Sequence, residues 1–215
     1  MNISQFKSLK ELHEYYAVNN KCGLKKTATQ PVYEIYPPSS GIVFIGEAPG
    51  KKEDFEGKPF VGSAGNFLDD ALSSISLKRN EVYVTNVVKY RPPNNREPFD
   101  TEKNACRVWL NAELLFLNPK IIITLGKHAL ERFVKNIKIS ASHGVAFSHS
   151  SGIPIFAMYH PAVALYNTAL KNTILDDFKK LRVFLDNGHK IGQDIGSESE
   201  KMSNKVTAID SILRL

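Results

Sequence analysis

The fold is decided by the stretch IVFIGEAPG, residues 42–50. Four apolar residues are followed at once by glycine, glutamate, alanine and proline, a pattern typical of a buried strand that ends in a polar loop. Open α/β folds build their ligand sites at the carboxyl ends of such strands. The stretch therefore predicts an α/β fold, and it directs the search for a functional site to residues 46–50.

Three more apolar runs repeat this arrangement further along the chain. They span residues 82–88, 121–126 and 154–158, and segments with a helical spacing of apolar residues separate them. Parallel strands need crossover connections, which helices normally supply. We therefore predict a three-layer α/β/α sandwich with a central four-stranded parallel sheet. Asp100 is expected to cap the helix that follows the second strand.

The composition indicates one domain with an appended tail. With 215 residues and 42% hydrophobic content the chain can bury one full core, so residues 1–188 are expected to form a single domain. Residues 189–215 are rich in glycine and serine, which predicts a flexible C-terminal tail. The net charge of +6 permits a polyanionic partner without requiring one.

Hydropathy and cysteine content bear on the compartment. No run approaches the roughly 20 apolar residues that a membrane-spanning helix needs, and the first residues lack the apolar stretch of a signal peptide. Cys22 and Cys106 are too few for a disulfide framework or for a structural zinc site with four thiolates. We expect a cytoplasmic monomer that does not associate with membranes.

Polar side chains follow three of the predicted strands. Glu47 comes after the first strand, Asn86 ends the second and His160 follows the fourth. Parallel strands end at one edge of a sheet, so these side chains can converge on one site. Each also has an ordinary explanation: a solvated glutamate, a turn asparagine and a surface-loop histidine.

Together these residues suit the recognition of a nucleobase. The Asn86 amide offers a donor and an acceptor that match the imide edge of a pyrimidine. His160 can donate to an oxygen that gains negative charge, and Phe60 offers a flat face for stacking. Such a set fits a base that is held outside its helical stack.

Several motifs in this order resemble those of the family 4 uracil-DNA glycosylases, over a span from about residue 21 to about residue 185. They are GEAPG at 46–50 with Glu53, GKPFVGSAG at 57–65, TNVVK at 85–89, RPP at 91–93 and HPA at 160–162. The resemblance implies a DNA repair glycosylase. Such an enzyme flips uracil out of DNA and hydrolyses its N-glycosidic bond, leaving an abasic site, with uracil-containing DNA as its partner.

The resemblance also implies how uracil is held. Phe60 would stack on the ring, Asn86 would read its polar edge, and Ala48 would line the same pocket. Glu53 would lie beside C5 and disfavour thymine by crowding its methyl group.

For catalysis, the resemblance implies that His160 hydrogen-bonds uracil O2 as charge moves onto the departing base. Glu47 and its neighbouring backbone would position the hydrolytic water. The most active glycosylases have an aspartate base where this motif has glutamate, so His160 carries the main catalytic assignment. One donor of this kind is typically worth about 3 kcal/mol.

DNA contacts are expected from the loops around this edge of the sheet. Ala162 and Leu165 would form an apolar wedge that enters the duplex where the base leaves it. Lys89 and Arg91 are expected to contact phosphates. Tyr166 can either stack on a base or pack against the protein.

Family 4 enzymes usually carry four cysteines that hold an iron-sulfur cluster. The matching positions here are Asn19, Cys22, Tyr90 and Cys106. Two thiolates are poor ligation for a cluster of the all-cysteine type, so we predict a variant without the cluster or any other metal. Cys22 and Cys106 would then be small buried hydrophobes, with Tyr90 filling the space of the cluster. The alternative is that the two cysteines bind a metal in another way.

Two functions from other classes compete with the glycosylase. The chain can be a non-catalytic binder of damaged or single-stranded DNA that keeps the uracil pocket. It can also be a nucleotide-binding protein that cradles phosphate in the loop 46–50. This loop lacks both the Gly-Lys-Ser/Thr ending of a P-loop and the spacing of a dinucleotide fingerprint.

Overall fold

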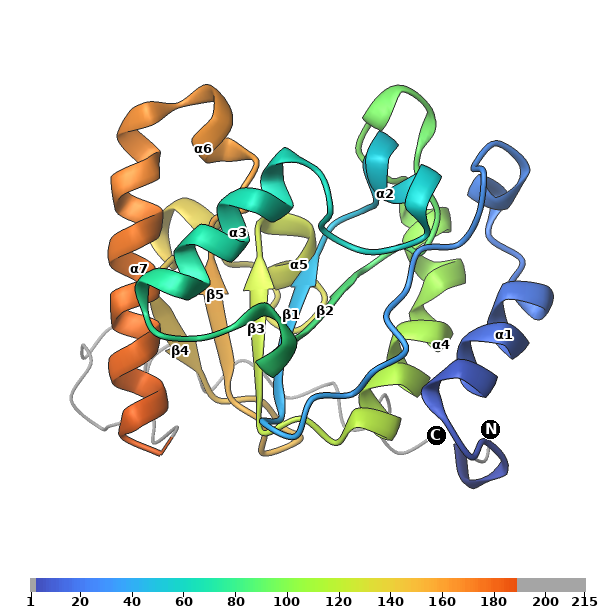
Figure 1. Ribbon diagram of the computed structural model, residues 1–215, viewed down its shortest axis with the longest axis horizontal. Coiled ribbons are helices and arrows are strands. Elements are labelled where there is room, and N and C mark those ends of the chain that lie inside the picture. Colours follow the sequence, from blue (N-terminus) through green and yellow to red (C-terminus); the bar gives the residue numbers. More distant parts are fainter. Residues whose placement is uncertain (1–2, 189–215) are drawn as a thin grey trace.

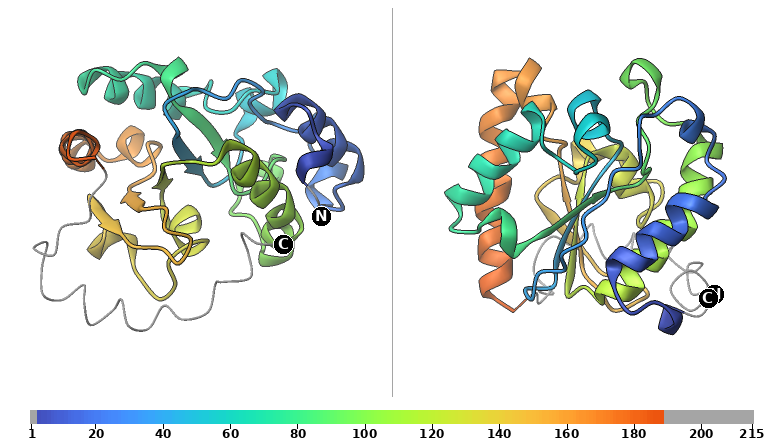
Figure 2. Two further views of the ribbon diagram at one scale, coloured as in Figure 1. Left: turned by 90° about the horizontal axis from the view of Figure 1, so that it is seen from below. Right: turned by 45° about the vertical axis from the view of Figure 1, so that its right-hand side comes forward.

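The computed structural model describes residues 3–188, in which a central sheet separates two layers of helices (Figure 1). The same layers are seen end-on in Figure 2, with the sheet between the α3/α7 side and the α1/α4 side. The predicted tail, residues 189–215, lies outside the described residues.

The sheet has five strands in the order β2-β1-β3-β5-β4. The four predicted strands are all present, and they pair in parallel with one another. The fifth, β4, runs antiparallel to β5 at one edge, so the prediction was one strand short. It has three half-buried residues, too few to give a strand pattern in the sequence. The strands are β1 (Ile42–Gly46), β2 (Tyr83–Asn86), β3 (Ile121–Leu125), β4 (Val145–Phe147) and β5 (Ile155–Met158).

Both faces of the sheet are covered, which explains the continuous apolar runs of the central strands. Val43 and Ile45 of β1 belong to the core on one face, whereas Ile42 and Phe44 belong to the core on the other. The first core lies under α1 (Leu9–Asn19), α4 (Asp100–Leu117) and α5 (Lys127–Glu131). The second lies under α3 (Ser63–Ser74), α6 (Val163–Tyr166) and α7 (Thr168–Asp186).

The start of α4 differs from the prediction. Asp100 is the first helical residue, and the N-cap position belongs to Phe99. Glu102 in the first turn accepts a hydrogen bond from the Phe99 N–H at 2.7 Å, the contact by which the third helical residue satisfies the N–H of the N-cap residue in a capping box. Asp100 pairs instead with Lys103, whose Nζ lies 2.8 Å from Oδ1.

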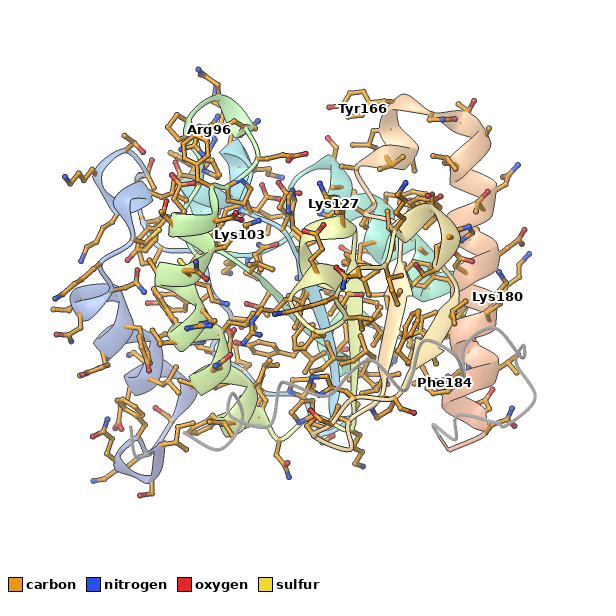
Figure 3. The ribbon with its side chains drawn as sticks, turned by 180° about the vertical axis from the view of Figure 1, so that it is seen from behind. Arg96, Lys103, Lys127, Tyr166, Lys180 and Phe184 are labelled. Carbon is orange, nitrogen blue, oxygen red and sulfur yellow. The ribbon has the colours of Figure 1, made fainter. Side chains whose placement is uncertain are left out.

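Short helices and loops extend beyond the carboxyl ends of the strands. The helix α2 (Lys51–Glu56) follows β1, a proline-rich loop with the 3₁₀ turn Pro93–Asn95 follows β2, and α6 follows β5; all three lie at the upper edge in Figure 1. Arg96 and Tyr166 mark the same edge in Figure 3. The other 3₁₀ turns are Ile3–Gln5, Gly23–Lys26, Arg79–Glu81 and Ile139–Ala141.

Candidate active site

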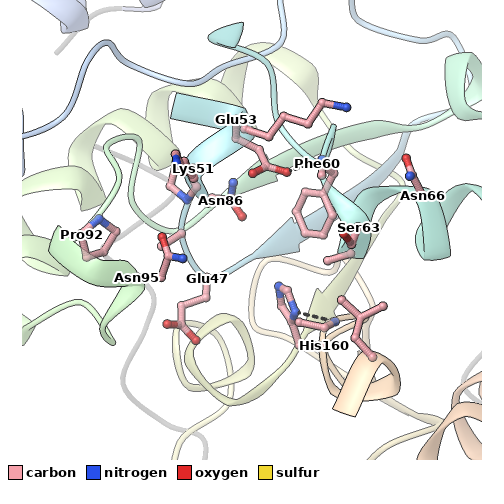
Figure 4. Close-up of a pocket in the computed structure, with 18 of the residues that line it drawn as sticks. Glu47, Lys51, Glu53, Phe60, Ser63, Asn66, Asn86, Pro92, Asn95 and His160 are labelled. Atoms are coloured by element: carbon pink, nitrogen blue, oxygen red, sulfur yellow. Dashed lines mark hydrogen bonds between the residues drawn. The ribbon is translucent and has the colours of Figure 1, made fainter. Parts of the chain in front are cut away.

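A cavity of about 610 Å³ opens at the carboxyl edge of the sheet (Figure 4). It brings together residues from β2, from α2 and α6, and from the loops after β1 and β5. Residues far apart in the sequence therefore meet at one place, as parallel strand ends predict. The predicted site residues that line it are Glu47, Ala48, Glu53, Phe60, Asn86, His160, Ala162 and Leu165.

Phe60 and Asn86 converge on the end of β1, where only glycine fits. A Cβ atom at Gly46 would lie 2.5 Å from Asn86 Oδ1 and 2.6 Å from Phe60 Cζ. Phe60 itself has φ = +55°, a left-handed conformation that is strained for a bulky residue. Its backbone carbonyl lies so close to Gly65 that a Cβ there would be 1.8 Å from the oxygen. The glycines of both motifs thus allow the phenylalanine ring to lie against the strand end.

Asn86 carries an unusual buried acceptor. The residue is 2% exposed, and its Oδ1 has no hydrogen-bond partner among residues 3–188. A buried polar atom left without a partner costs roughly 1–3 kcal/mol. An N–H group of a ligand in the cavity would satisfy this oxygen and recover that free energy.

His160 presents one defined nitrogen to the cavity. Its Nδ1 accepts a hydrogen bond from the backbone N–H of Ala162 at 3.1 Å, so the proton of the neutral ring is on Nε2. Burial lowers the pKa of His160 to about 4, which keeps the ring neutral near pH 7. The ring centroid lies 5.6 Å from that of Phe60, with the planes tilted by 32°. The residue is a neutral hydrogen-bond donor beside the aromatic face.

Glu53 lines the cavity and also holds two neighbouring segments together through a hydrogen bond. The side chain is buried on α2, and its Oε1 accepts a hydrogen bond from the Gly62 N–H at 2.7 Å. This contact ties the helix after the loop 46–50 to the loop that carries Phe60.

Glu47 lies at the mouth of the cavity and faces a histidine that the sequence did not single out. Oε2 of Glu47 is 3.8 Å from Nε2 of His128, which is itself 3.1 Å from Oε2 of Glu97. Burial raises the pKa of Glu47; the charge of His128 opposes this rise and that of Glu97 adds to it. His128 comes two residues after Gly126, at the end of the third strand, and this position was its signal in the sequence.

Lys89 does not face DNA, so the prediction for this residue was wrong. Its side chain is fully buried, and Nζ lies 2.6 Å from Oε2 of Glu113 on α4. The same ammonium group donates to the backbone oxygen of Asn86 at 3.1 Å and to the Thr85 hydroxyl. Lys89 therefore stabilises the end of β2 through its contacts with Thr85 and Asn86.

The other expected DNA contacts lie at the surface around the cavity. Leu165 is 45% exposed and Tyr166 is 90% exposed, so Tyr166 does not pack against the protein. Arg91 is outside the cavity lining, and its Nε donates to Oδ1 of Asn95 at 2.7 Å. Arg96, five residues further on, lines the cavity and binds both carboxylate oxygens of Glu102.

The residues at the four cluster positions do not fit an iron-sulfur cluster. Cys22 and Cys106 are buried free thiols, and no group of three or more His, Cys, Asp or Glu residues within 3–188 can hold a metal ion. The Asn19 amide donates to the backbone oxygen of Tyr15 at 2.8 Å. The buried Tyr90 ring packs edge-on against Trp109, with the centroids 6.1 Å apart.

Comparisons with known proteins agree with this geometry. The family model described as the uracil DNA glycosylase superfamily matches residues 33–181. A type-4 uracil-DNA glycosylase of Sulfurisphaera tokodaii is 41% identical over 184 residues, which cover 81% of this chain and 84% of that protein. Another, of Archaeoglobus fulgidus, is 41% identical over 170 residues, covering 75% and 85%. A third, of Thermotoga maritima, is 40% identical over 148 residues, covering 67% and 77%.

The described helices include none that is long and apolar enough to cross a membrane. The strands of the sheet and the residues that line the cavity all lie within residues 33–181, the span that the family model matches. The chain belongs to the type-4 family of the uracil-DNA glycosylase superfamily, as a member with two of the family's four cluster cysteines.

Proposed function

We propose that this protein flips uracil out of DNA and hydrolyses its N-glycosidic bond, leaving an abasic site. The observation that carries the proposal is the buried Oδ1 of Asn86, an acceptor without a partner among the described residues, beside the ring of Phe60, whose backbone is held at φ = +55°. A pyrimidine with an N–H at position 3 satisfies that acceptor. Membership of the type-4 family supports the same activity.

In the proposed complex, uracil lies on the face of Phe60. The Asn86 amide accepts from N3–H and donates to O4, and Ala48 lines the cavity beside the ring. The Glu53 carboxylate lies beside C5, where it disfavours the methyl group of thymine. Its hydrogen bond to the Gly62 N–H holds that carboxylate in place.

The proposed reaction breaks the bond between C1′ of the sugar and N1 of uracil. The electron pair leaves with uracil, and Nε2–H of His160 donates to O2 as negative charge develops there. Water adds to C1′, and Glu47 takes its proton. Glu47 then releases that proton to solvent and the uracil anion takes one up, so the products are neutral uracil and an abasic sugar, and no cofactor is needed.

We propose that DNA lies across the carboxyl edge of the sheet. Ala162 and Leu165 form the wedge, and the exposed Tyr166 stacks on a base beside the gap. Arg91 contacts a phosphate.

We further propose that the protein works without an iron-sulfur cluster, as a monomer in a reducing compartment such as the cytoplasm. The buried Tyr90 supports the absence of a cluster, and the two free, buried cysteines support both that absence and a reducing compartment. Light scattering after size-exclusion chromatography tests whether the protein is a monomer in solution.

The test is cleavage of an oligonucleotide with one uracil. Incubation with the protein followed by alkali is expected to cut the strand at the uracil, because an abasic site is alkali-labile. A non-catalytic binder would retard the oligonucleotide on a gel and leave it intact. A nucleotide-binding protein would do neither.

A further inference from the structure

The Glu47 carboxylate does not simply face solvent. Its side chain is 31% exposed, and in Figure 4 it turns away from the Phe60 ring. It turns toward His128, in the first turn of α5, whose side chain is 6% exposed. His128 lies outside the sequence motifs that contribute residues to the cavity.

Four charged groups surround the His128 ring. On the Nε2 side, Oε2 of Glu97 is 3.1 Å away and Oε2 of Glu47 is 3.8 Å away. On the Nδ1 side, Nζ of Lys103 is 3.5 Å away and Oε2 of Glu131 is 3.6 Å away. The ring thus connects the loop after β1, the proline-rich loop after β2, and the helices α4 and α5.

We propose that His128 is a positioning residue for Glu47. His128 holds the Glu47 carboxylate at the cavity mouth in the ionised form. Glu97 completes the contact from the proline-rich loop. The inference rests on the proposed function, in which Glu47 takes the proton of the hydrolytic water.

The physical reason is the cost of a half-buried negative charge. Burial raises the pKa of Glu47, and Glu97 raises it further. Among the neighbours that lower it, His128 has the largest effect, ahead of Lys103 and Lys127. Without His128, Glu47 stays protonated up to a higher pH, and a protonated carboxyl group cannot accept a proton from water.

A purely structural role for His128 predicts a different result. Loss of packing would lower the excision rate by the same factor at every pH. Loss of the interaction with His128 instead moves the acid limb of the pH–rate profile to higher pH, because the fraction of ionised Glu47 falls only near its pKa. The alkaline plateau then stays close to that of the wild type.

The experiment measures single-turnover excision of uracil from a single-stranded oligonucleotide between pH 5 and 9. In His128→Asn the midpoint of the acid limb should rise by about one pH unit, which lowers the rate on that limb about tenfold. The plateau should stay within about threefold of the wild type. A parallel fall at every pH, or an unchanged profile, overturns the proposal.

A control isolates the contact with Glu47. His143→Asn removes a histidine that pairs with Asp177 outside the cavity lining. This variant should keep the wild-type acid limb. If His128→Asn does not fold, His128→Gln takes its place.

A second arm separates this inference from the proposed function. In a Glu47→Gln background, His128→Asn should cause no further loss, whereas an additional loss of full size would contradict the coupling. Wild-type excision by Glu47→Gln would overturn the inference and leave the glycosylase standing. If no protein releases uracil, the proposed function fails. Carbon-13 NMR titration of the Glu47 carboxyl group then decides the role of His128, since an unchanged midpoint in His128→Asn contradicts it.

Discussion

The backbone N–H of Ala162 donates a hydrogen bond to Nδ1 of His160 across 3.1 Å, the contact dashed in Figure 4. A nitrogen that accepts a hydrogen bond carries no proton, so Nε2 is the donor of the neutral ring. Burial lowers the pKa of His160 to about 4 and keeps the ring in this state. In the proposed reaction, the loop after β5 thus orients a neutral donor toward the leaving uracil.

Replacing this donor tests its catalytic role. His160→Ala should lower the single-turnover excision rate by roughly two orders of magnitude, because one lost donor at a developing anion costs about 3 kcal/mol. The affinity for uracil-containing DNA, measured by fluorescence anisotropy, should stay nearly unchanged. Near wild-type excision by this variant would refute the assignment.

A second prediction concerns the base edge. Asn86→Asp places a carboxylate oxygen opposite uracil O4 in a buried position, so uracil excision should fall sharply. Asn66→Asp is the matched control, because Asn66 lines the same cavity but is exposed on α3. The control should retain most of the activity. Equal rates for the two variants would make Asn86 a turn residue only.

Gly46 offers a test of the close contact at the strand end. A methyl group there meets both Asn86 Oδ1 and Phe60 Cζ below 3 Å, so Gly46→Ala must displace the two residues proposed to hold uracil. Overpacking of this kind costs about 1–3 kcal/mol, and kcat/KM should fall at least about tenfold while the protein stays folded. A Cβ at Gly23 would meet no other side chain or backbone atom within 4 Å, so Gly23→Ala should leave kcat/KM unchanged. Full activity in Gly46→Ala would contradict the geometry.

Because His13 is buried, we expect the free energy of unfolding to depend on pH. Its Nδ1 accepts from Trp109 Nε1 at 2.8 Å, and burial lowers its pKa from 6.5 to about 4. The unfolded chain therefore binds this proton at a higher pH than the folded protein. The contribution of His13 to stability is full above about pH 6.5 and falls by about 3 kcal/mol as the pH drops to about 4.

Urea unfolding measured at several pH values in this range checks the prediction. In His13→Gln the part of the pH dependence due to His13 should disappear, on top of a constant loss of stability. A pH dependence equal to that of the wild type would show that other groups cause it.

At two of the four positions where the family has cluster cysteines, this chain has Asn19 and Tyr90, so we predict a protein without the cluster. Purified protein should be colourless, contain no stoichiometric iron and fold without added metal. Cys22→Ser and Cys106→Ser should each cost about 1–2 kcal/mol, as expected when a hydroxyl replaces a small buried thiol. Visible absorbance with several iron atoms per chain, lost in either variant, would show that the cluster is present.

The sequence predicts Glu47, Asn86 and His160 as one group because parallel strands end at one edge, and that topology follows from apolar runs alone. It does not predict the burial of Lys89. A lysine near a strand end resembles a phosphate contact, and its partner Glu113 lies on a helix 24 residues away. His128 was missed for a similar reason, since its neighbours come from other elements and meet only in the folded chain.

Release of free uracil tests the central claim most directly. An oligonucleotide with one uracil is incubated with excess protein, and the small-molecule fraction is analysed by chromatography. We predict one equivalent of free uracil and a matching alkali-labile break for the wild type, with far less of both for His160→Ala at the same time point. Tight binding of the oligonucleotide without free uracil would contradict the account.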